Sequence, residues 1–254
     1  MDLGLKDKVV LVTAGSQGIG LATAQGYHGE GARVAICARG ADKLAAAAAT
    51  MPGCLALQAD VTDAAQIEAM TREVAAQLGP VDVLVVNAGG PPPGLFEDLD
   101  DAAWLNATNL TLMSAVRMTR AVLPAMRARR WGRIVIISSV GVKQPVPNLT
   151  LSNSIRMAVL GWAKTLAQQV AGDNVLINTV CPGFTRTARI EQILGPAGDG
   201  PNPAEAAMAA QIPLGRIAEA KEIAGLAVFL GSEVARYMTG TAIAVDGGSA
   251  RGYA

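Results

Sequence analysis

The sequence predicts an α/β fold built on one doubly wound parallel sheet of seven strands, with helices on both faces. Three observations lead to this prediction. Short apolar runs rich in β-branched residues alternate with longer helical patterns along all 254 residues. The runs are almost continuously apolar, as in parallel strands that are covered on both faces. Apolar residues make up 51% of the chain and charged residues 17%, which suits helices packed closely on a sheet.

The predicted strands are Val9–Thr13, Arg33–Cys37, Leu55–Ala59, Val81–Val86, Gly132–Ser138, Asn174–Val180 and Thr241–Val245. Helical patterns lie between them, at Asp63–Leu78, Asp101–Arg129, Ser152–Ala171 and Ala218–Leu230. Asp63 and Asp101 each begin an alanine-rich run, where a carboxylate can bind the first backbone N–H groups, so both are predicted N-caps. No linker interrupts the pattern, and we expect a single domain over residues 1–254.

One segment, Ala188–Pro213, departs from this alternation. Three glycines and four prolines occur within it. It is too long for an ordinary connection between elements, so we predict a substrate-binding loop or lid. A disordered surface insertion is the alternative.

Composition excludes several classes of function. Lys and Arg together number 21, as do Asp and Glu, so no net field would attract nucleic acid or an anionic membrane. No apolar stretch reaches about 18 residues and no signal core is found, so we expect a cytoplasmic protein. Three cysteines without a CxxC pair suit buried thiols in a reducing compartment. His28 is the only histidine and no carboxylate cluster accompanies it, so no metal site is predicted.

A glycine-rich turn joins the first predicted strand to the first predicted helix. It reads Thr13-Ala14-Gly15-Ser16-Gln17-Gly18-Ile19-Gly20. Glycines here allow the backbone to approach a pyrophosphate, whose negative charge then faces the amino end of the helix. The position between strand and helix makes the motif a strong indication of dinucleotide binding. The predicted cofactor-binding residues of this turn are Gly15, Ser16, Gln17, Gly18, Ile19 and Gly20.

The end of the second predicted strand indicates which dinucleotide is bound. An NAD-selective site usually has an acidic residue there, which binds the ribose 2′-hydroxyl. This chain has Ala38 followed by Arg39, whose guanidinium can pair with a 2′-phosphate. We therefore predict NADP(H) in preference to NAD(H). The alternative is that Arg39 is a solvated turn residue.

These motifs, with others in the same order, resemble the short-chain dehydrogenase/reductase family over nearly the whole chain. The further matching segments are Asp60-Val61, Asn87-Ala88-Gly89, Asn109, Ser138-Ser139, Pro182-Gly183, Thr187 and Asp246-Gly247-Gly248. The resemblance implies a Rossmann-type domain, a small-molecule substrate and a homotetramer or homodimer. One departure is Ala14, which replaces the family's usual glycine. We expect Gly15 to supply the missing flexibility one position later.

The resemblance also assigns roles to residues. It implies that Asp60 and Val61 contact the adenine, and that Asn87, Ala88 and Gly89 shape the cofactor cleft. It implies that Pro182, Gly183 and Thr187 hold the nicotinamide amide. Asn109 takes the place of the family's structural and proton-relay asparagine, and Ser139 takes the place of its catalytic serine.

The resemblance fails at the residues that move the proton. In the family, a tyrosine donates a proton to the carbonyl oxygen, and a lysine one helical turn later lowers the tyrosine's pKa and binds the ribose. Counted from Ser139, these two positions hold Ser152 and Arg156. A serine hydroxyl is a far weaker acid than a phenol, and arginine stays protonated at physiological pH. Tyr27, Tyr237 and Tyr253 are distant in sequence, although Tyr253 could reach a neighbouring subunit's site.

The sequence thus predicts an NADPH-dependent oxidoreductase that transfers hydride to a small organic C=O or C=N group with an atypical centre. Ser139 would orient the substrate, Arg156 would bind the ribose, Asn109 would order local water, and Ser152 would form a weak hydrogen bond. An iminium, or a hemiaminal that ionises to one, is our hypothesis for the substrate, because its reduction needs no proton. The alternatives are slow reduction of an ordinary ketone, a non-catalytic nucleotide-binding regulator or scaffold, and non-redox chemistry on the same scaffold.

Overall fold

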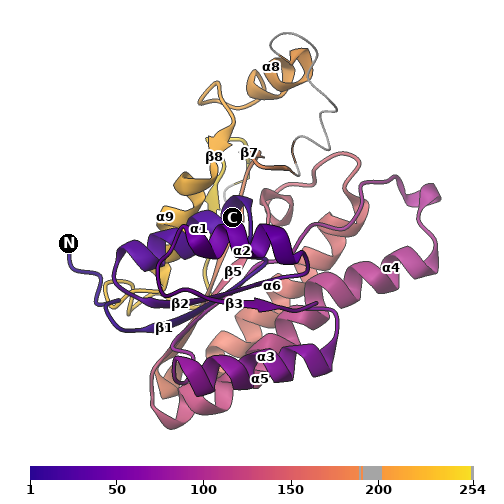
Figure 1. Cartoon of the computed structure of the whole chain (residues 1–254). Helices are drawn as coiled ribbons and strands as arrows, with labels where there is room; N and C mark the ends of the chain where they lie inside the picture. Colours follow the sequence, from indigo (N-terminus) through magenta and orange to yellow (C-terminus); the bar gives the residue numbers. More distant parts are fainter. Residues whose placement is uncertain (189, 191–201, 253–254) are drawn as a thin grey trace.

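The computed structural model of the chain describes residues 1–254 except 189, 191–201 and 253–254 (Figure 1). Its main sheet has seven parallel strands in the order β3-β2-β1-β4-β5-β6-β9. They are β1 Val9–Thr13, β2 Arg33–Ala38, β3 Leu55–Gln58, β4 Val83–Val86, β5 Gly132–Ile137, β6 Val175–Pro182 and β9 Ala242–Val245. The predicted doubly wound parallel sheet is confirmed. The strand order reverses between β1 and β4, which is where such sheets bind their ligands.

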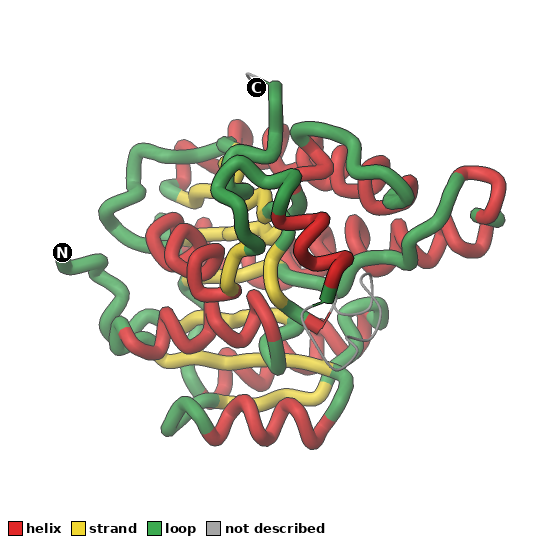
Figure 2. Tube along the Cα trace, turned by 90° about the horizontal axis from the view of Figure 1, so that it is seen from above, coloured by secondary structure: helices red, strands yellow, loops and turns green. Residues whose placement is uncertain are grey.

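The helices form a layer on each face of the sheet (Figure 2). They are α1 Gly18–Gly29, α2 Ala41–Ala49, α3 Ala64–Gln77, α4 Asp101–Thr108, α5 Ser114–Ala128, α6 Thr150–Val170 and α9 Ala220–Leu230. A further helix, α8 Pro203–Ala209, lies apart from these layers (Figure 1). One buried apolar cluster joins the sheet to α3, α5 and α6. A second cluster joins the opposite face to α1, α2 and α9. Burial on both faces explains why the strands are almost continuously apolar. In the part of the chain that the structure describes, no helix is both long and apolar enough to cross a bilayer.

The predicted helix over Asp101–Arg129 is divided in the structure. A π-helical turn, η2 Asn109–Met113, separates α4 from α5. The N-cap prediction at Asp101 is wrong, because the side chain of Asp100 accepts the hydrogen bond from the Ala103 N–H at 2.8 Å. Adjacent aspartates offer the same cap chemistry, and only the backbone path decides which of them precedes the helix. The cap at Asp63 is confirmed by its bonds from the N–H groups of residues 65 and 66.

Tyr27 connects α1 to α9 in the core. Its side chain is fully buried, and its hydroxyl donates a hydrogen bond to the Ala227 carbonyl at 2.7 Å. A Cβ at Gly231 would lie 2.1 Å from the tyrosine oxygen, so the close approach of α9 requires a glycine there. Burial raises the pKa of Tyr27 above its usual value, which makes the hydroxyl a poorer proton donor.

We expect Tyr27→Phe to lower the free energy of unfolding by about 1 kcal/mol, the scale of one neutral hydrogen bond. Urea denaturation measures this. Tyr237→Phe, at a fully exposed tyrosine, is the matched control and should leave the free energy of unfolding unchanged. An equal free energy of unfolding in Tyr27→Phe and the native protein would contradict the structural role of this hydrogen bond.

Candidate active site

The glycine-rich turn leaves β1 through a strained alanine. Ala14 has φ 46°, in the left-handed region that disfavours a Cβ, whereas Gly15 lies outside that region. The expectation that Gly15 supplies the missing flexibility is therefore wrong, because Ala14 itself adopts the unusual conformation. Gly15 is required for a different reason: a Cβ there would lie 2.8 Å from a methyl carbon of Ile36 on β2.

The amino end of α1 approaches the strand ends closely. A Cβ at Gly20 would lie 2.2 Å from the Ala14 carbonyl oxygen and 2.8 Å from the Asn87 side-chain nitrogen. Asn87 in turn is bound to β1, since its N–H donates to the Thr13 hydroxyl at 2.8 Å. These contacts leave the backbone of the turn open to a ligand at the point where the strand order reverses. The arrangement fits a bound pyrophosphate at the helix terminus.

One cavity of about 340 Å³ opens beside the turn at the ends of β2 and β3. Its lining includes the predicted residues Ser16, Gln17, Arg39, Asp60, Val61, Ala88 and Gly89, together with Lys43. Asp60 is the one acidic lining residue among those described, and its carboxylate already accepts two hydrogen bonds from Thr62. Exposed Arg39 and Lys43 are its two cations. The charges therefore fit an adenosine that carries a 2′-phosphate.

Sequence reasoning did not identify Lys43. The signal was present, because Lys43 is a second cation four residues after Arg39, and it lies in the first turn of α2. The Lys43 ammonium donates to the Gln17 side chain at 3.4 Å, so it lies next to the glycine-rich turn.

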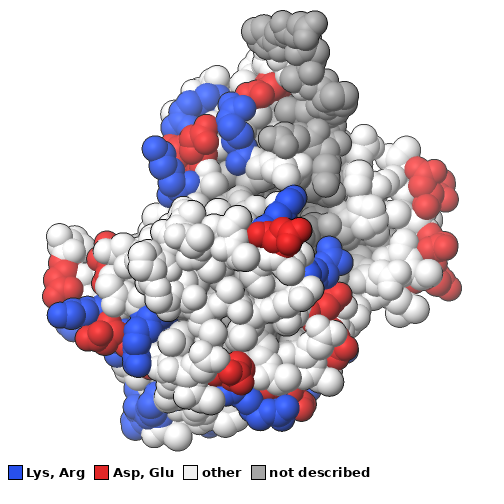
Figure 3. Space-filling view, in the orientation of Figure 1, with Lys and Arg blue, Asp and Glu red and all other residues white. Residues whose placement is uncertain are grey.

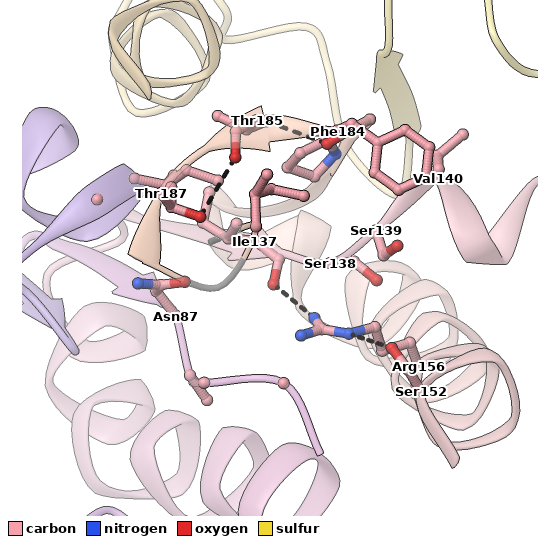
Figure 4. A pocket seen from close by; sticks show the side chains of 18 of the residues that line it. Asn87, Ile137, Ser138, Ser139, Val140, Ser152, Arg156, Phe184, Thr185 and Thr187 are labelled. Carbon is pink, nitrogen blue, oxygen red and sulfur yellow. Dashed lines mark hydrogen bonds between the residues drawn. The ribbon is translucent and has the colours of Figure 1, made fainter. Parts of the chain in front are cut away.

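A second cavity of about 260 Å³ adjoins the first and reaches the ends of β5 and β6 (Figure 4). Most of its walls are apolar, from Ile19, Ile137, Val140, Val146, Leu149, Phe184 and Ile190. The predicted residues on its lining are Gln17, Gly18, Ile19, Asn87, Ala88, Gly89, Ser139, Ser152, Arg156, Pro182, Gly183 and Thr187. Among the described lining residues, Arg156 alone carries a charge.

Ser152 and Arg156 form a hydrogen-bonded pair on the first turns of α6. The Arg156 Nε donates to the Ser152 oxygen at 3.2 Å, and its Nη1 donates to the Ile137 carbonyl at 3.1 Å (Figure 4). Both side chains are buried, with 8% and 9% exposed. Because the Ser152 oxygen accepts from the guanidinium, the serine's own hydrogen can donate to a ligand in the cavity. The anchor to β5 holds this pair at the end of the strand.

Two further hydroxyls follow β5. The Ser139 oxygen accepts from the Gly141 N–H at 3.0 Å, which leaves its hydrogen able to donate to a ligand. Ser138 is also on the cavity lining, and its buried hydroxyl has no hydrogen-bond partner within the described residues. Ser138 was not among the predicted site residues, because the resemblance assigns a role only to the second serine.

Asn109 lies outside the lining of both cavities. Its side-chain oxygen accepts from Arg117 at 2.6 Å, and its amide donates to the Thr62 carbonyl at 3.3 Å. Arg117 also donates to the Thr62 carbonyl, at 3.1 Å. The Asn109 side chain thus joins the start of η2 to the loop after β3 and to α5. It does not meet Ser139 or Ser152 across the cavity.

The predicted loop Ala188–Pro213 is described only in part. Ala188 and Ile190 line the second cavity, while residues 189 and 191–201 lie outside the described residues. The helix α8 within this segment is bound to the strand β7 Thr185–Arg186, because Arg186 pairs with Glu205 at 2.6 Å. Arg186 also pairs at 3.1 Å with Glu219, on the neighbouring strand β8 Ala218–Glu219.

The tyrosines that the structure describes line neither of these two cavities. Tyr27 is in the core and Tyr237 is on the surface, while Tyr253 lies outside the described residues. No group of three or more His, Cys, Asp or Glu side chains within the described ranges could hold a metal ion.

Comparisons with known proteins agree with this architecture. A family model described as enoyl-(acyl carrier protein) reductase matches residues 13–250. The 3-oxoacyl-[acyl-carrier-protein] reductase FabG of Haemophilus influenzae is 33% identical over 247 residues, which cover 96% of this chain and 98% of that protein.

Solved structures are similar over almost their whole length. L-sorbose reductase from Gluconobacter frateurii, complexed with NADPH and L-sorbose, has a TM-score of 0.94 and 33% identity, with 99% of this chain and 100% of that chain covered. A short chain oxidoreductase from Pseudomonas aeruginosa PAO1, described as containing an atypical catalytic center, has a TM-score of 0.92 and 31% identity, with 98% and 99% covered. With its fold, its cofactor turn and these relatives taken together, the chain belongs to the short-chain dehydrogenase/reductase family.

Proposed function

We propose that this protein is an NADPH-dependent reductase of small carbonyl compounds, in which the Ser152–Arg156 pair replaces the family's tyrosine and lysine. The observation that carries the proposal is the hydrogen bond between these two side chains inside the apolar cavity at the end of β5. The NADPH-bound sorbose reductase and the oxidoreductase with an atypical center support it.

The residues of the two cavities would hold NADP(H) in an extended form. Arg39 and Lys43 would pair with the 2′-phosphate, and the turn Gly15–Gly20 would bind the pyrophosphate. Pro182, Gly183 and Thr187 would hold the nicotinamide beside Ser139. When bound, NADPH supplies the hydride that adds to the substrate carbon.

The chain's own groups would act on the substrate oxygen. The hydroxyls of Ser139 and Ser152 would donate hydrogen bonds to it, and Arg156 would add positive charge behind Ser152. As the carbon accepts the hydride, the oxygen gains the electron pair of the C=O bond and becomes an alkoxide. Donors already oriented in an apolar cavity stabilise that charge strongly. The alkoxide then takes the proton of the Ser152 hydroxyl, and Ser152 recovers a proton from water.

The charge of Arg156 favours a carbonyl over the iminium that the missing tyrosine first suggested. An iminium is a cation, and a buried guanidinium would repel it. This repulsion is stronger inside the protein than between the same two charges in water. A carbonyl instead develops negative charge during reduction, which the guanidinium stabilises. A regulator that only binds a nucleotide would not need this cation paired with hydroxyl donors, so the pair also favours an enzyme over a regulator.

The test is NADPH consumption, followed by absorbance, over a panel of ketones matched in size to cyclic iminiums. We expect turnover of ketones and little turnover of iminiums. Iminium turnover alone would overturn the carbonyl assignment. Tight NADPH binding without any turnover would favour the regulator. In the double variant Ser152→Tyr/Arg156→Lys, which rebuilds the family pair, we expect faster ketone reduction, because a phenol is the stronger acid.

We expect ketone reduction to be nearly independent of pH between about 5 and 9, because neither a serine hydroxyl nor a guanidinium titrates in that range. The measurement is kcat over this range with saturating NADPH. The double variant is the comparison, since its lysine would lower the pKa of the new tyrosine toward this range and restore a slope. A bell-shaped profile in the native protein would reveal a proton donor other than Ser152.

We also propose that the protein is a homo-oligomer, as a homodimer or homotetramer, through α5 and α6. A hollow of about 350 Å³ on these helices is lined by Val116, Leu123 and Trp162, with Arg120 and Arg127 beside them. Exposed acidic residues gather at the other end of this helical segment, before and at the start of α4 (Figure 3). Antiparallel packing of two copies about a two-fold axis would bring opposite charges together. Analytical ultracentrifugation tests this, and a monomer at micromolar concentration would contradict it.

A further inference from the structure

Asn153 binds the backbone of Val146 through both ends of its side-chain amide. Its nitrogen donates to the Val146 carbonyl at 2.9 Å, and its oxygen accepts from the Val146 N–H at 3.2 Å. Asn153 lies in the first turn of α6, directly after Ser152. We infer that Asn153 is a positioning residue that determines which substrates fit, because it holds the cavity wall formed by residues 146–149. This inference rests on the proposed reductase function.

The sequence of the wall explains why it depends on this side chain. Val146 stands between Pro145 and Pro147, so it has the only backbone N–H of the three residues. Asn153 binds that N–H and also the carbonyl of the same residue. Val146 and Leu149 project into the lining of the second cavity. The two prolines prevent this part of the wall from joining a regular hydrogen-bond ladder. The amide of Asn153 therefore fixes it instead.

A second contact connects the same turn of α6 to the opposite loop. The Thr150 hydroxyl donates to the Gly94 carbonyl at 2.9 Å, and the Gly94 N–H donates to the Asn148 carbonyl at 2.8 Å. One helical turn thus carries Ser152 and, on either side of it, two side chains that bind the backbone of other segments. Thr150 connects this turn to Gly94, which is itself bound to Asn148 in the wall.

The neighbouring glycine leaves room for the Asn153 amide. A Cβ at Gly141 would lie 2.7 Å from the Asn153 oxygen. The N–H of the same glycine donates to Ser139. Asn153 therefore fills the space between the turn that orients Ser139 and the wall that encloses the substrate. It is absent from the lining of both cavities, so its loss acts on a ligand only through the wall.

The test compares Asn153→Ala and Asn153→Asp with Ser154→Ala, an exposed neighbour on the same helix that serves as the matched control. For each protein, kcat and KM are measured for aliphatic ketones of increasing bulk, and the NADPH Kd is measured by fluorescence. Amide hydrogen exchange at Val146 reports on the wall independently of activity.

In Asn153→Ala we expect the ratio of kcat/KM for bulky over small ketones to rise roughly tenfold, the scale of one or two backbone hydrogen bonds, with an unchanged NADPH Kd. Exchange at Val146 becomes faster in the same variant. Asn153→Asp falls between the alanine variant and the native protein, because a carboxylate still accepts from the Val146 N–H but cannot donate to its carbonyl. Ser154→Ala behaves like the native protein.

Two results would overturn the inference while leaving the reductase intact. One is an unchanged substrate ratio in Asn153→Ala. The other is an equal loss on all ketones together with weaker NADPH binding, which would indicate a general structural role. If the native protein reduces none of the ketones, the proposed function fails first and the assignment of substrate range fails with it.

Discussion

Arg156→Met is expected to lower kcat/KM for a ketone by about 100- to 1000-fold, the usual cost of removing one oriented donor from an oxyanion site. Methionine keeps much of the volume of the buried side chain but loses its charge and its bonds to Ser152 and to the Ile137 carbonyl. The developing alkoxide would then meet a serine with no cation behind it. Steady-state kinetics at saturating NADPH measure the effect.

Arg72→Met, at an exposed arginine on α3, is the control for this experiment and should match the native protein. If the substitution weakened NADPH binding while kcat stayed unchanged, Arg156 would serve only the ribose. Combining Arg156→Met with Ser152→Ala tests whether the two side chains act together. Residues that act as a unit show non-additive effects, so Ser152→Ala/Arg156→Met should be little slower than Arg156→Met alone.

Arg39→Asp is expected to reduce the preference for NADPH over NADH by about 100-fold, since a charge-assisted bond to a phosphate is lost and a repulsive charge is introduced. The new carboxylate can also accept from the ribose 2′-hydroxyl of NADH. The measurement is kcat/KM for each cofactor with one ketone. Because Arg39 and Lys43 are exposed, the native preference should also weaken at high salt.

Arg236→Asp makes the same charge change at an exposed site away from both cavities and should preserve the preference. Lys43→Ala should lower the preference in the same direction as Arg39→Asp but by less, because it removes one cation without introducing a negative charge. An unchanged ratio of kcat/KM for NADPH over NADH in Arg39→Asp would identify Arg39 as a solvated turn residue. Another group would then determine the choice of cofactor.

Local signals in the sequence were sufficient for the sheet, and most of the predicted cofactor residues line the two cavities. Strands buried on both faces must be apolar throughout, so β1, β5 and β6 were predicted within two residues at each end. The glycines of the turn and the cation at Arg39 follow directly after strands, where a parallel sheet binds its ligand. Ser152 and Arg156 were likewise identified by their spacing from Ser139, which matches the spacing of the family's tyrosine and lysine.

Contacts between distant segments decided the rest. Ala14 adopts a left-handed conformation because of how the turn packs against Asn87 and α1, which no local propensity describes. The side chain of Asn109 is bound by Arg117 and by the loop after β3, so its place away from the cavity depends on how α5 packs. Asn153 binds Val146 across a loop with two prolines, a pairing that only the folded chain shows.

The difference between the features that the sequence predicts and those that only the folded chain shows has a physical cause. Burial and backbone conformation depend on each residue's own chemistry and on its near neighbours, so the sequence by itself determined the sheet, the glycine-rich turn and the spacing of Ser152 and Arg156. The tertiary structure alone decided that Arg156 donates to Ser152 in an apolar cavity and that Asn153 binds the backbone of Val146, which lines that cavity. A hydrogen bond requires two groups at a defined distance and angle, and packing across the sheet sets that geometry.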